Sequence, residues 1–324
     1  MNRIHLTFDY EMFFGTQTGT VENCMLKPTA ALIELASRHT VRFVFFIDAG
    51  MLSAMRRQVK AYPELDHALT LISRQIEALA RANHSVQLHI HPHWQDSFYD
   101  GARWQMKTAR YRLAQFSENE VHEIVRDYKK EITQITSRPV FAFRAGGLCI
   151  QPFSRIGPAL RANQIHVDSS IYPGGRMHSA SHQIDFTHAP LRTIWKFEDD
   201  PCHEAANGYF TEYPITPHRY SQFFFARMAV HRMVRTERFA KIGDGSGMVG
   251  DSARIASAFL KGSRDMASLD GYRVTKLAAA IRHFYAQEKD GHFVAIGHPK
   301  ALSRKSFDVI ADLAERHTRA ITIF

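Results

Sequence analysis

Two carboxylates follow the first apolar stretch of the chain. Asp9 and Glu11 come directly after Ile4–Phe8, and their i, i+2 spacing puts both side chains on one face of an extended segment. Two carboxylates on one face repel each other unless a cation lies between them. The pair therefore predicts a cation-binding site at the end of a strand.

Three histidines in five positions follow another short apolar stretch. His89, His91 and His93 come after Val86–Leu88, and Pro92 restricts the backbone between the last two. Imidazole is a ready metal ligand because it is neutral near pH 7 and offers a nitrogen lone pair. One carboxylate and two imidazoles would leave coordination positions open for water and substrate, as catalytic metal sites need.

Other strand-like stretches also end in polar side chains. Arg144 ends one of them and suits a guanidinium held beside a carboxylate, although in isolation it favours a structural ion pair. His298, between a glycine and a proline, is placed for acid–base work or is a buried structural histidine. Asp168 and Glu212 end two further stretches. Because strand ends of a parallel barrel converge on one face, these residues together predict one site.

The elements that must position these side chains alternate between strand-like and helix-like patterns. Strand-like stretches include Val86–Ile90 and Ala320–Phe324, and a helical pattern spans His67–Arg81. The nearly continuous apolar content of Val41–Ile47 is typical of a strand buried on both faces. The alternation predicts βα units around a parallel sheet, an α/β fold, in a single domain over residues 1–324. Two longer stretches interrupt the rhythm, at about 94–116 and 222–268, and are candidate substrate-binding insertions.

Composition narrows the classes of protein. Of the 324 residues 45% are hydrophobic, enough for a substantial core, and the longest apolar runs are far shorter than the roughly 20 residues of a transmembrane helix. Cys24, Cys149 and Cys202 are widely spaced, which indicates neither a disulfide framework nor a cysteine zinc site. With no leader-like segment before Ile4, we expect a cytoplasmic protein without a transmembrane segment.

The formal net charge of +9 favours anionic ligands such as sugar nucleotides, acidic glycans or anionic lipid surfaces. The Lys and Arg residues are spread along the chain and do not form one basic arm. We therefore expect no nucleic-acid partner.

Taken in order, these segments resemble the polysaccharide deacetylase family with the NodB homology domain, carbohydrate esterase family 4. The resemblance covers most of the chain and rests on five motifs in the family's order. These motifs are Thr7-Phe8-Asp9, the pair His89 and His93, Phe143-Arg144-Ala145-Gly146, Asp168-Ser169-Ser170 and Gly297-His298-Pro299. The stretch Leu88–Trp94 looks like a subgroup associated with bacterial surface-polysaccharide and O-antigen gene sets.

The resemblance implies a single distorted barrel of (β/α)7 type with long loop insertions. The implied activity is metal-dependent removal of an N- or O-acetyl group from a sugar, a sugar nucleotide or a lipid-linked glycan, with Zn²⁺ or a similar divalent ion. His89 and His93 would bind the metal, and His298 would be the general acid. Arg144 would hold the catalytic base ionised and oriented, and Asp168 would support His298.

The first motif departs from the family pattern. The family commonly has two adjacent aspartates there, one acting as base and the next as metal ligand, whereas Tyr10 follows Asp9 in this chain. With Asp9 as base, Glu11 becomes the carboxylate ligand; the alternative is that Asp9 itself binds the metal. His91 is an additional potential donor whose direction the sequence leaves open.

Substrate contacts are expected from the first insertion and from one further strand end. Trp94 and Trp104 could stack on sugar faces, or pack the insertion onto the barrel, and Glu212 is a third candidate. Two other functions fit the same fold: a catalytically silent carbohydrate-binding barrel and a metal-independent amidase. The sequence leaves the oligomeric state open.

Overall fold

The computed structural model describes residues 1–248 and 252–324, and the chain forms two compact units. Their segments are Met1–Phe8, Met12–Phe43 and Ile215–Phe324 in unit 1, and Asp9–Glu11 and Val44–Pro214 in unit 2. The single domain over 1–324, with insertions at about 94–116 and 222–268, stays a prediction. Residues 249–251 of the second insertion lie outside the described residues.

Unit 2 is built on a row of six strands in the order β10-β11-β7-β6-β3-β2. Neighbours from β2 to β11 are parallel, and β10 is antiparallel to β11. The strands are β2 (Val44–Asp48), β3 (Ser85–Ile90), β6 (Ala142–Ala145), β7 (Val167–Asp168), β10 (Trp195–Phe197) and β11 (Phe210–Glu212). The helices are α2 (Ala49–Gln58), α3 (Glu64–Arg81), α4 (Glu118–Thr136) and α5 (Gly157–Ala162). Two hairpin-like pairs complete the unit, β4 (Phe98–Tyr99) with β5 (Trp104–Gln105) and β8 (Arg176–His178) with β9 (Gln183–Asp185).

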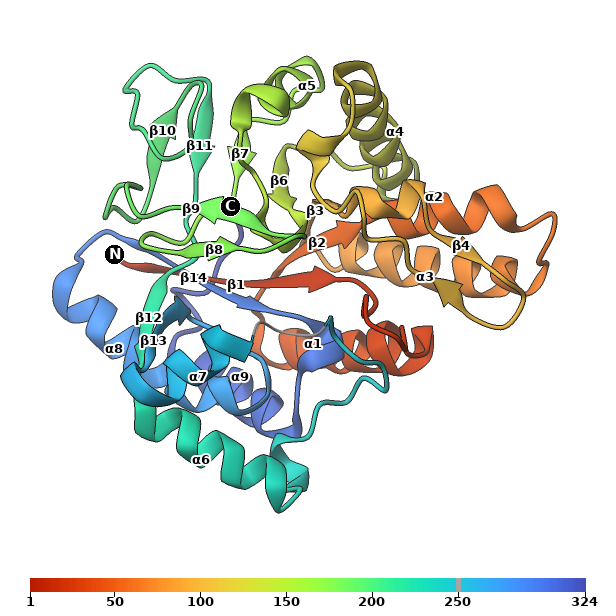
Figure 1. Cartoon of the computed structure of the whole chain (residues 1–324). Helices are drawn as coiled ribbons and strands as arrows, with labels where there is room; N and C mark the ends of the chain where they lie inside the picture. The colour runs from red at the N-terminus through yellow and green to blue at the C-terminus, as the bar shows by residue number, and fades with distance from the viewer. Residues whose placement is uncertain (249–251) are drawn as a thin grey trace. The chain divides into compact units, whose positions relative to one another are not determined.

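Unit 1 contains the parallel pair β1 (Arg3–Tyr10) and β14 (His292–Gly297), with Asp9 and Tyr10 of β1 counted in unit 2. Its other strands, β12 (Pro217–Tyr220) and β13 (Ser263–Met266), pair antiparallel. The helices are α1 (Lys27–His39), α6 (Gln222–Met233), α7 (Ser252–Lys261), α8 (Leu277–Gln287) and α9 (Arg304–Arg316) (Figure 1). The strand expected near the C-terminus is reduced to one parallel bridge between Ile321 and Ile4.

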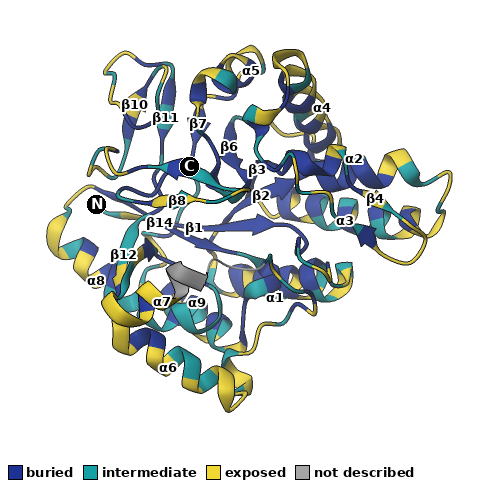
Figure 2. Cartoon of the chain, in the orientation of Figure 1, coloured by how far each residue is buried: buried dark blue, intermediate teal, exposed yellow. Residues whose placement is uncertain are grey.

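The predicted α/β class is confirmed, because each unit combines helices with parallel strands. Strand β3 is buried over its whole length, as a parallel strand covered on both faces requires (Figure 2). Helix α3 turns a stripe of apolar residues, from Leu65 to Leu79 at helical spacing, toward the core. Helix α4 begins at a capping box, in which the Ser117 N–H donates to Glu120 at 2.8 Å.

Parallel register brings the polar strand ends together in unit 2. His89 on β3 lies opposite Arg144 on β6, and Asp168 on β7 lies opposite Phe143, the residue before Arg144. Asp9, the second-last residue of strand β1, is also buried, with 3% of its surface exposed. The sheet therefore places four of the predicted site residues at the carboxyl ends of its strands.

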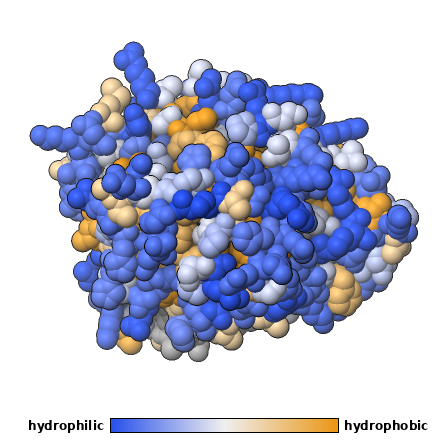
Figure 3. Space-filling model, turned by 90° about the horizontal axis from the view of Figure 1, so that it is seen from above, coloured by the Kyte–Doolittle hydropathy of each residue, from blue (hydrophilic) through white to orange (hydrophobic). Residues whose placement is uncertain are grey.

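Outside the core, hydrophilic residues cover most of the face drawn in Figure 3, with apolar residues in small patches between them. The three cysteines are buried, and none forms a disulfide. Within the described residues, no helix combines the length and apolar character that crossing a membrane demands.

Candidate active site

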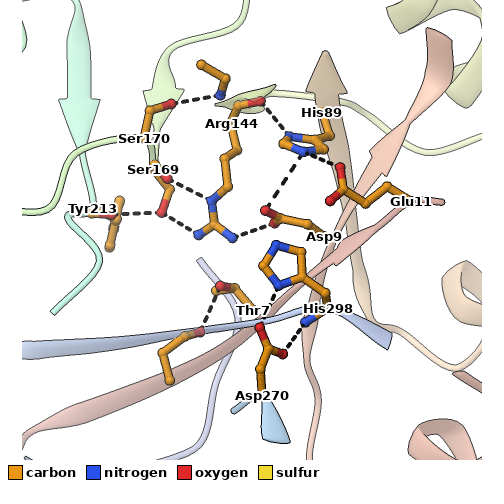
Figure 4. Close-up of polar contacts among 12 residues, drawn as sticks. Thr7, Asp9, Glu11, His89, Arg144, Ser169, Ser170, Tyr213, Asp270 and His298 are labelled. Atoms are coloured by element: carbon orange, nitrogen blue, oxygen red, sulfur yellow. Dashed lines mark hydrogen bonds and ion pairs between the residues drawn. The ribbon is translucent and has the colours of Figure 1, made fainter. Parts of the chain in front are cut away.

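A buried arginine organises the polar centre of unit 2 (Figure 4). Arg144 Nη1 donates to Asp9 Oδ1 at 2.7 Å. Its Nε and Nη2 donate to the backbone oxygen and the hydroxyl of Ser169 at 2.7 and 2.9 Å. The guanidinium carbon lies 4.2 Å from the ring centre of Phe46. With Oδ1 of Asp9 held in this way, its Oδ2 is the oxygen directed toward His89, at 3.8 Å from Nε2.

Two imidazoles converge on Glu11 beside this ion pair. His89 Nε2 lies 3.1 Å and His91 Nε2 lies 2.7 Å from Glu11 Oε2. His89 Nδ1 donates to the backbone oxygen of Arg144 at 2.8 Å, which directs Nε2 to the carboxylates. Burial alone would lower the pKa of His89, but the carboxylates of Asp9 and Glu11 outweigh it and raise the pKa to about 9. The cluster thus favours positive charge at its centre.

The donor set fits a divalent metal ion. Glu11, His89 and His91 are all buried, and each offers a ligand atom within 4.8 Å of the other two. One carboxylate and two imidazoles match the donors of catalytic zinc sites that keep a position open for water. The hydrogen bond of His89 to a backbone carbonyl is the outer contact that orients metal-binding histidines. These three residues are therefore the group that could hold the ion.

His93, which the sequence predicts as a ligand, points to a different neighbourhood. Its ring stacks on Tyr111, with ring centres 5.4 Å apart, and on Trp94 at 5.7 Å. His91 lies between the two groups, 4.7 Å from His89 and 5.3 Å from His93 by ring centres. A metal role for His93 stays a prediction, while the geometry points to His91 as the second histidine ligand.

The residues predicted for substrate binding are mostly covered by protein. Trp94 is fully buried, donates to Asp48 Oδ2 at 2.5 Å and packs edge-on against Trp104. Tyr111 is buried too, and burial, reinforced by the Glu11 carboxylate, raises its pKa well above the ordinary value. Residues 94–116 are thus held to unit 2 by their aromatic side chains, and sugar binding by Trp94, Trp104 or Glu212 stays a prediction.

Asp168 and Glu212 form a buried acid pair. They lie opposite each other on β7 and β11, with 1% and 0% of their surfaces exposed. Asp168 accepts from the backbone N–H and the hydroxyl of Ser170 at 3.1 and 2.7 Å, and Glu212 accepts from the Ile171 N–H at 3.1 Å. Burial and the charge of Asp168 raise the pKa of Glu212 well above its ordinary value. Of the two buried carboxyls, Glu212 is therefore the one that favours its protonated form.

This pair predicts a pH dependence of stability that Glu212→Gln removes. The folded pKa of Glu212 lies above the unfolded value of about 4.3. Glu212 therefore makes its full contribution to the free energy of unfolding below that pH, and this contribution declines as pH rises toward the folded pKa. The free energy of unfolding of the wild type, relative to Glu212→Gln, should fall by about 1.4 kcal/mol per pH unit in this window. Denaturant unfolding at a series of pH values measures it.

The exposed Glu118→Gln variant serves as the control and should show no such trend. Equal pH profiles for the wild type and Glu212→Gln would show that Glu212 is ionised in the folded protein.

In unit 1, His298 is paired with an aspartate that the sequence reasoning missed. The backbone N–H of His298 donates to Asp270 Oδ1 at 2.8 Å, and its Nδ1 donates to Oδ2 at 2.7 Å (Figure 4). The side chains are 25% and 22% exposed. A carboxylate on Nδ1 orients the ring and makes Nε2 the nitrogen suited to proton transfer. Asp270 is the partner that the structure gives His298, and support of His298 by Asp168 stays a prediction.

Sequence signals for the missed residues are weak. Asp270 lies in a short segment whose only regular pairing among the described residues is the bridge from Ser268 to Ile296 on β14. Tyr111 and Asp48 come near Glu11 and His89 only in the folded chain, because they lie far from them in the sequence. His91 was visible as an extra histidine, but only the structure gives its direction.

Comparisons with known proteins bear on the fold. No family model matches this sequence, and no sequence among the curated proteins matches it. A provisionally assigned polysaccharide deacetylase from Mycobacterium smegmatis is 12% identical and superposes over 96% of this chain and 83% of its own, with a TM-score of 0.50. A family 4 carbohydrate esterase from Streptomyces lividans, in complex with acetate, is 9% identical over 98% and 88% of the two chains, with a TM-score of 0.40. At 12% identity the first likeness shows a shared fold: the chain is folded like that mycobacterial protein.

Proposed function

We propose that the protein is a metal-dependent hydrolase that removes an N- or O-linked acetyl group from a sugar. The observation that carries the proposal is the buried cluster of unit 2, in which Arg144 holds Asp9 while His89 and His91 converge on Glu11. The likeness in fold and the five motifs add support. A precursor of a bacterial surface polysaccharide, such as an O-antigen sugar on a nucleotide or lipid carrier, is the proposed substrate class.

In this proposal Glu11, His89 and His91 hold Zn²⁺ or a similar divalent ion. When bound, such an ion polarises the acyl carbonyl and acidifies water. His89 suits this role because its Nδ1–H donates a hydrogen bond to the Arg144 carbonyl, so Nε2 is the nitrogen that can bind the metal. Asp9 and Glu11 therefore have separate roles. Asp9 lies beside the guanidinium of Arg144, and Glu11 lies between the imidazoles of His89 and His91.

Asp9 is the proposed general base. Arg144 holds Oδ1, so Oδ2 is the oxygen that takes the proton of the attacking water. As the water oxygen bonds to the acyl carbon, the bond to the sugar nitrogen or oxygen breaks and acetate forms. The leaving amine or hydroxyl needs a proton, and His298, oriented by Asp270, is the proposed donor.

The experiment that tests this function is acetate release by the purified full-length protein. With added Zn²⁺, the protein should release acetate from acetylated chito-oligosaccharides or O-acetylated xylan, and chelation should stop the release until metal is restored. Metal uptake without acetate release from either class would contradict the proposed reaction. If the protein takes up no metal and releases no acetate but binds the same sugars, the result would favour the silent carbohydrate-binding barrel.

The choice of ligands has its own test, which is the metal content of single variants. Glu11→Gln and His91→Ala should each weaken Zn²⁺ binding by more than about 100-fold, beyond the 10–100-fold that outer contacts contribute. His93→Ala, the matched control on the same turn, should keep most of the metal because its ring packs on Tyr111. Loss of metal from His93→Ala but not from His91→Ala would reverse the assignment.

A further inference from the structure

Helix α6 exposes apolar side chains to an unusual extent. Phe223, Val230, Met233 and Val234 are 71%, 56%, 82% and 66% exposed. Phe223, Val230 and Val234 lie at i, i+7 and i+11, on one stripe of the helix. Contiguous exposed apolar patches usually mark a site of interaction. We name the exposed residues of this helix and its C-terminal turn the α6 face: Phe223, Arg227, Val230, Arg232, Met233, Val234 and Arg235.

The opposite side of α6 fixes the helix to unit 1. Phe224 and Phe225 are buried in a cluster with Tyr220 and Ala258. Tyr272 packs against Phe224, with ring centres 5.1 Å apart. The helix is thus anchored along one side, and its other side is exposed (Figure 2).

Positive charge accompanies the apolar stripe. Residues 217–236 contain four arginines and no Asp or Glu. Arg227 follows Phe223 by four residues on the stripe, and Arg232 and Arg235 are exposed at the C-terminal end of the helix. Across the described residues no ion pair is recorded for these three, whereas Arg273 pairs with Asp265 at 2.8 Å. The charge of the α6 face is therefore available to an external anion.

A cavity of about 610 Å³ opens at the start of α6. Its lining includes Phe223 and Arg227 from the helix and Tyr272, Thr275 and Lys276 from the segment after Asp270. A lining that contains two cationic side chains, Arg227 and Lys276, beside aromatic ones suits a phosphate group with an apolar attachment.

We propose that the α6 face binds the surface of an anionic phospholipid bilayer. A helix that combines exposed Phe, Val and Met with arginines has the composition of interfacial membrane-binding helices. Its apolar residues would enter the headgroup boundary, and its arginines would contact lipid phosphates. A second copy of the chain is the poorer occupant, because a two-fold interface would bring the same unpaired arginines together.

The α6 face is connected to the predicted catalytic histidine within unit 1. Tyr272, two residues after Asp270, packs against both Phe224 and His231 of α6, the latter with ring centres 4.9 Å apart. Asp270 in turn accepts two hydrogen bonds from His298. The membrane-binding helix and the His298–Asp270 pair thus share one packed segment.

Vesicle co-sedimentation of the full-length protein tests the proposal independently of turnover. We expect binding to vesicles of phosphatidylglycerol and phosphatidylcholine in equal parts, weakened by salt, and little binding to phosphatidylcholine alone. The triple variant Arg227→Gln, Arg232→Gln, Arg235→Gln should bind about 100-fold more weakly. The triple variant Phe223→Ser, Val230→Ser, Val234→Ser should lose at least about tenfold.

The control is Leu191→Ser, which removes an apolar side chain that is 78% exposed in unit 2 and should bind as the wild type does. Circular dichroism verifies that each variant is folded. Equal binding of wild type and both triple variants, or no binding to anionic vesicles, would overturn the proposal. If only the oligomeric state in light scattering changed in the triple variants, the α6 face would be an interface between copies and the proposal would be wrong.

Discussion

Replacing Asp9 by Asn is expected to lower the turnover number for acetate release by about 10²–10⁴-fold, the usual contribution of a general base. Asparagine keeps the shape of the side chain and an oxygen that accepts from Arg144 Nη1, so the polar contact at 2.7 Å can persist. What it loses is the ability to take a proton from water. Steady-state kinetics on an acetylated sugar, with Zn²⁺ saturating, measures the effect.

Glu11→Gln is the matched control, because the two carboxylates are neighbours with different partners. Asp9→Asn should retain bound Zn²⁺ and lose turnover, whereas Glu11→Gln should lose the metal itself. If Asp9→Asn lost its metal and Glu11→Gln kept it, Asp9 would be the ligand, as the alternative interpretation of the first motif holds. Wild-type turnover by Asp9→Asn would remove Asp9 from the mechanism altogether.

Replacing Arg144 by Met is expected to lower the free energy of unfolding by about 3–5 kcal/mol. Arg144 is 0% exposed and Asp9 only 3%, so the variant leaves a buried carboxylate without its cation and Ser169 without two donors. The guanidinium also covers the ring of Phe46, a contact that methionine replaces only in part. Denaturant unfolding of wild type and variant, at one pH, measures the loss.

A double variant separates the charge from the packing. Arg144→Met with Asp9→Asn removes both members of the ion pair, and it should be more stable than Arg144→Met alone because no uncompensated charge stays buried. Equal stability of the single and double variants would mean that the ion pair does not account for the effect of Arg144.

Long periodic segments were predicted well because local sequence is sufficient for them. The apolar stretch Val86–Ile90 lies within β3, and the helical pattern at His67–Arg81 lies within α3. Apolar residues at a spacing of two or of 3–4 residues must face a core wherever the chain places it. The α/β class followed from the alternation of these patterns.

Other elements depended on distant neighbours. Helix α2 follows β2 without a loop and contains Gly50, which is a poor helix former. A Cβ at Gly50 would meet Trp94 and Tyr128 at 2.9 Å, so a close approach from two other segments requires this glycine. By contrast, Ala320–Phe324 has the composition of a strand, but within residues 1–248 and 252–324 its one β-bridge joins Ile321 to Ile4.

The sequence by itself determined the chemistry that is available: which strands end in Asp9, His89, Arg144, Asp168 and His298, and that carboxylates and imidazoles gather there. Only the tertiary structure decided which of these side chains contact one another. Pro92–Gln95 forms a short helical turn, and Tyr111 from the following segment stacks on His93, while His91 turns to Glu11. Side-chain direction after a strand depends on loop dihedrals and on partners far along the chain. For the same reason Asp270 and Glu212 acquired their partners, His298 and Asp168, only through folding.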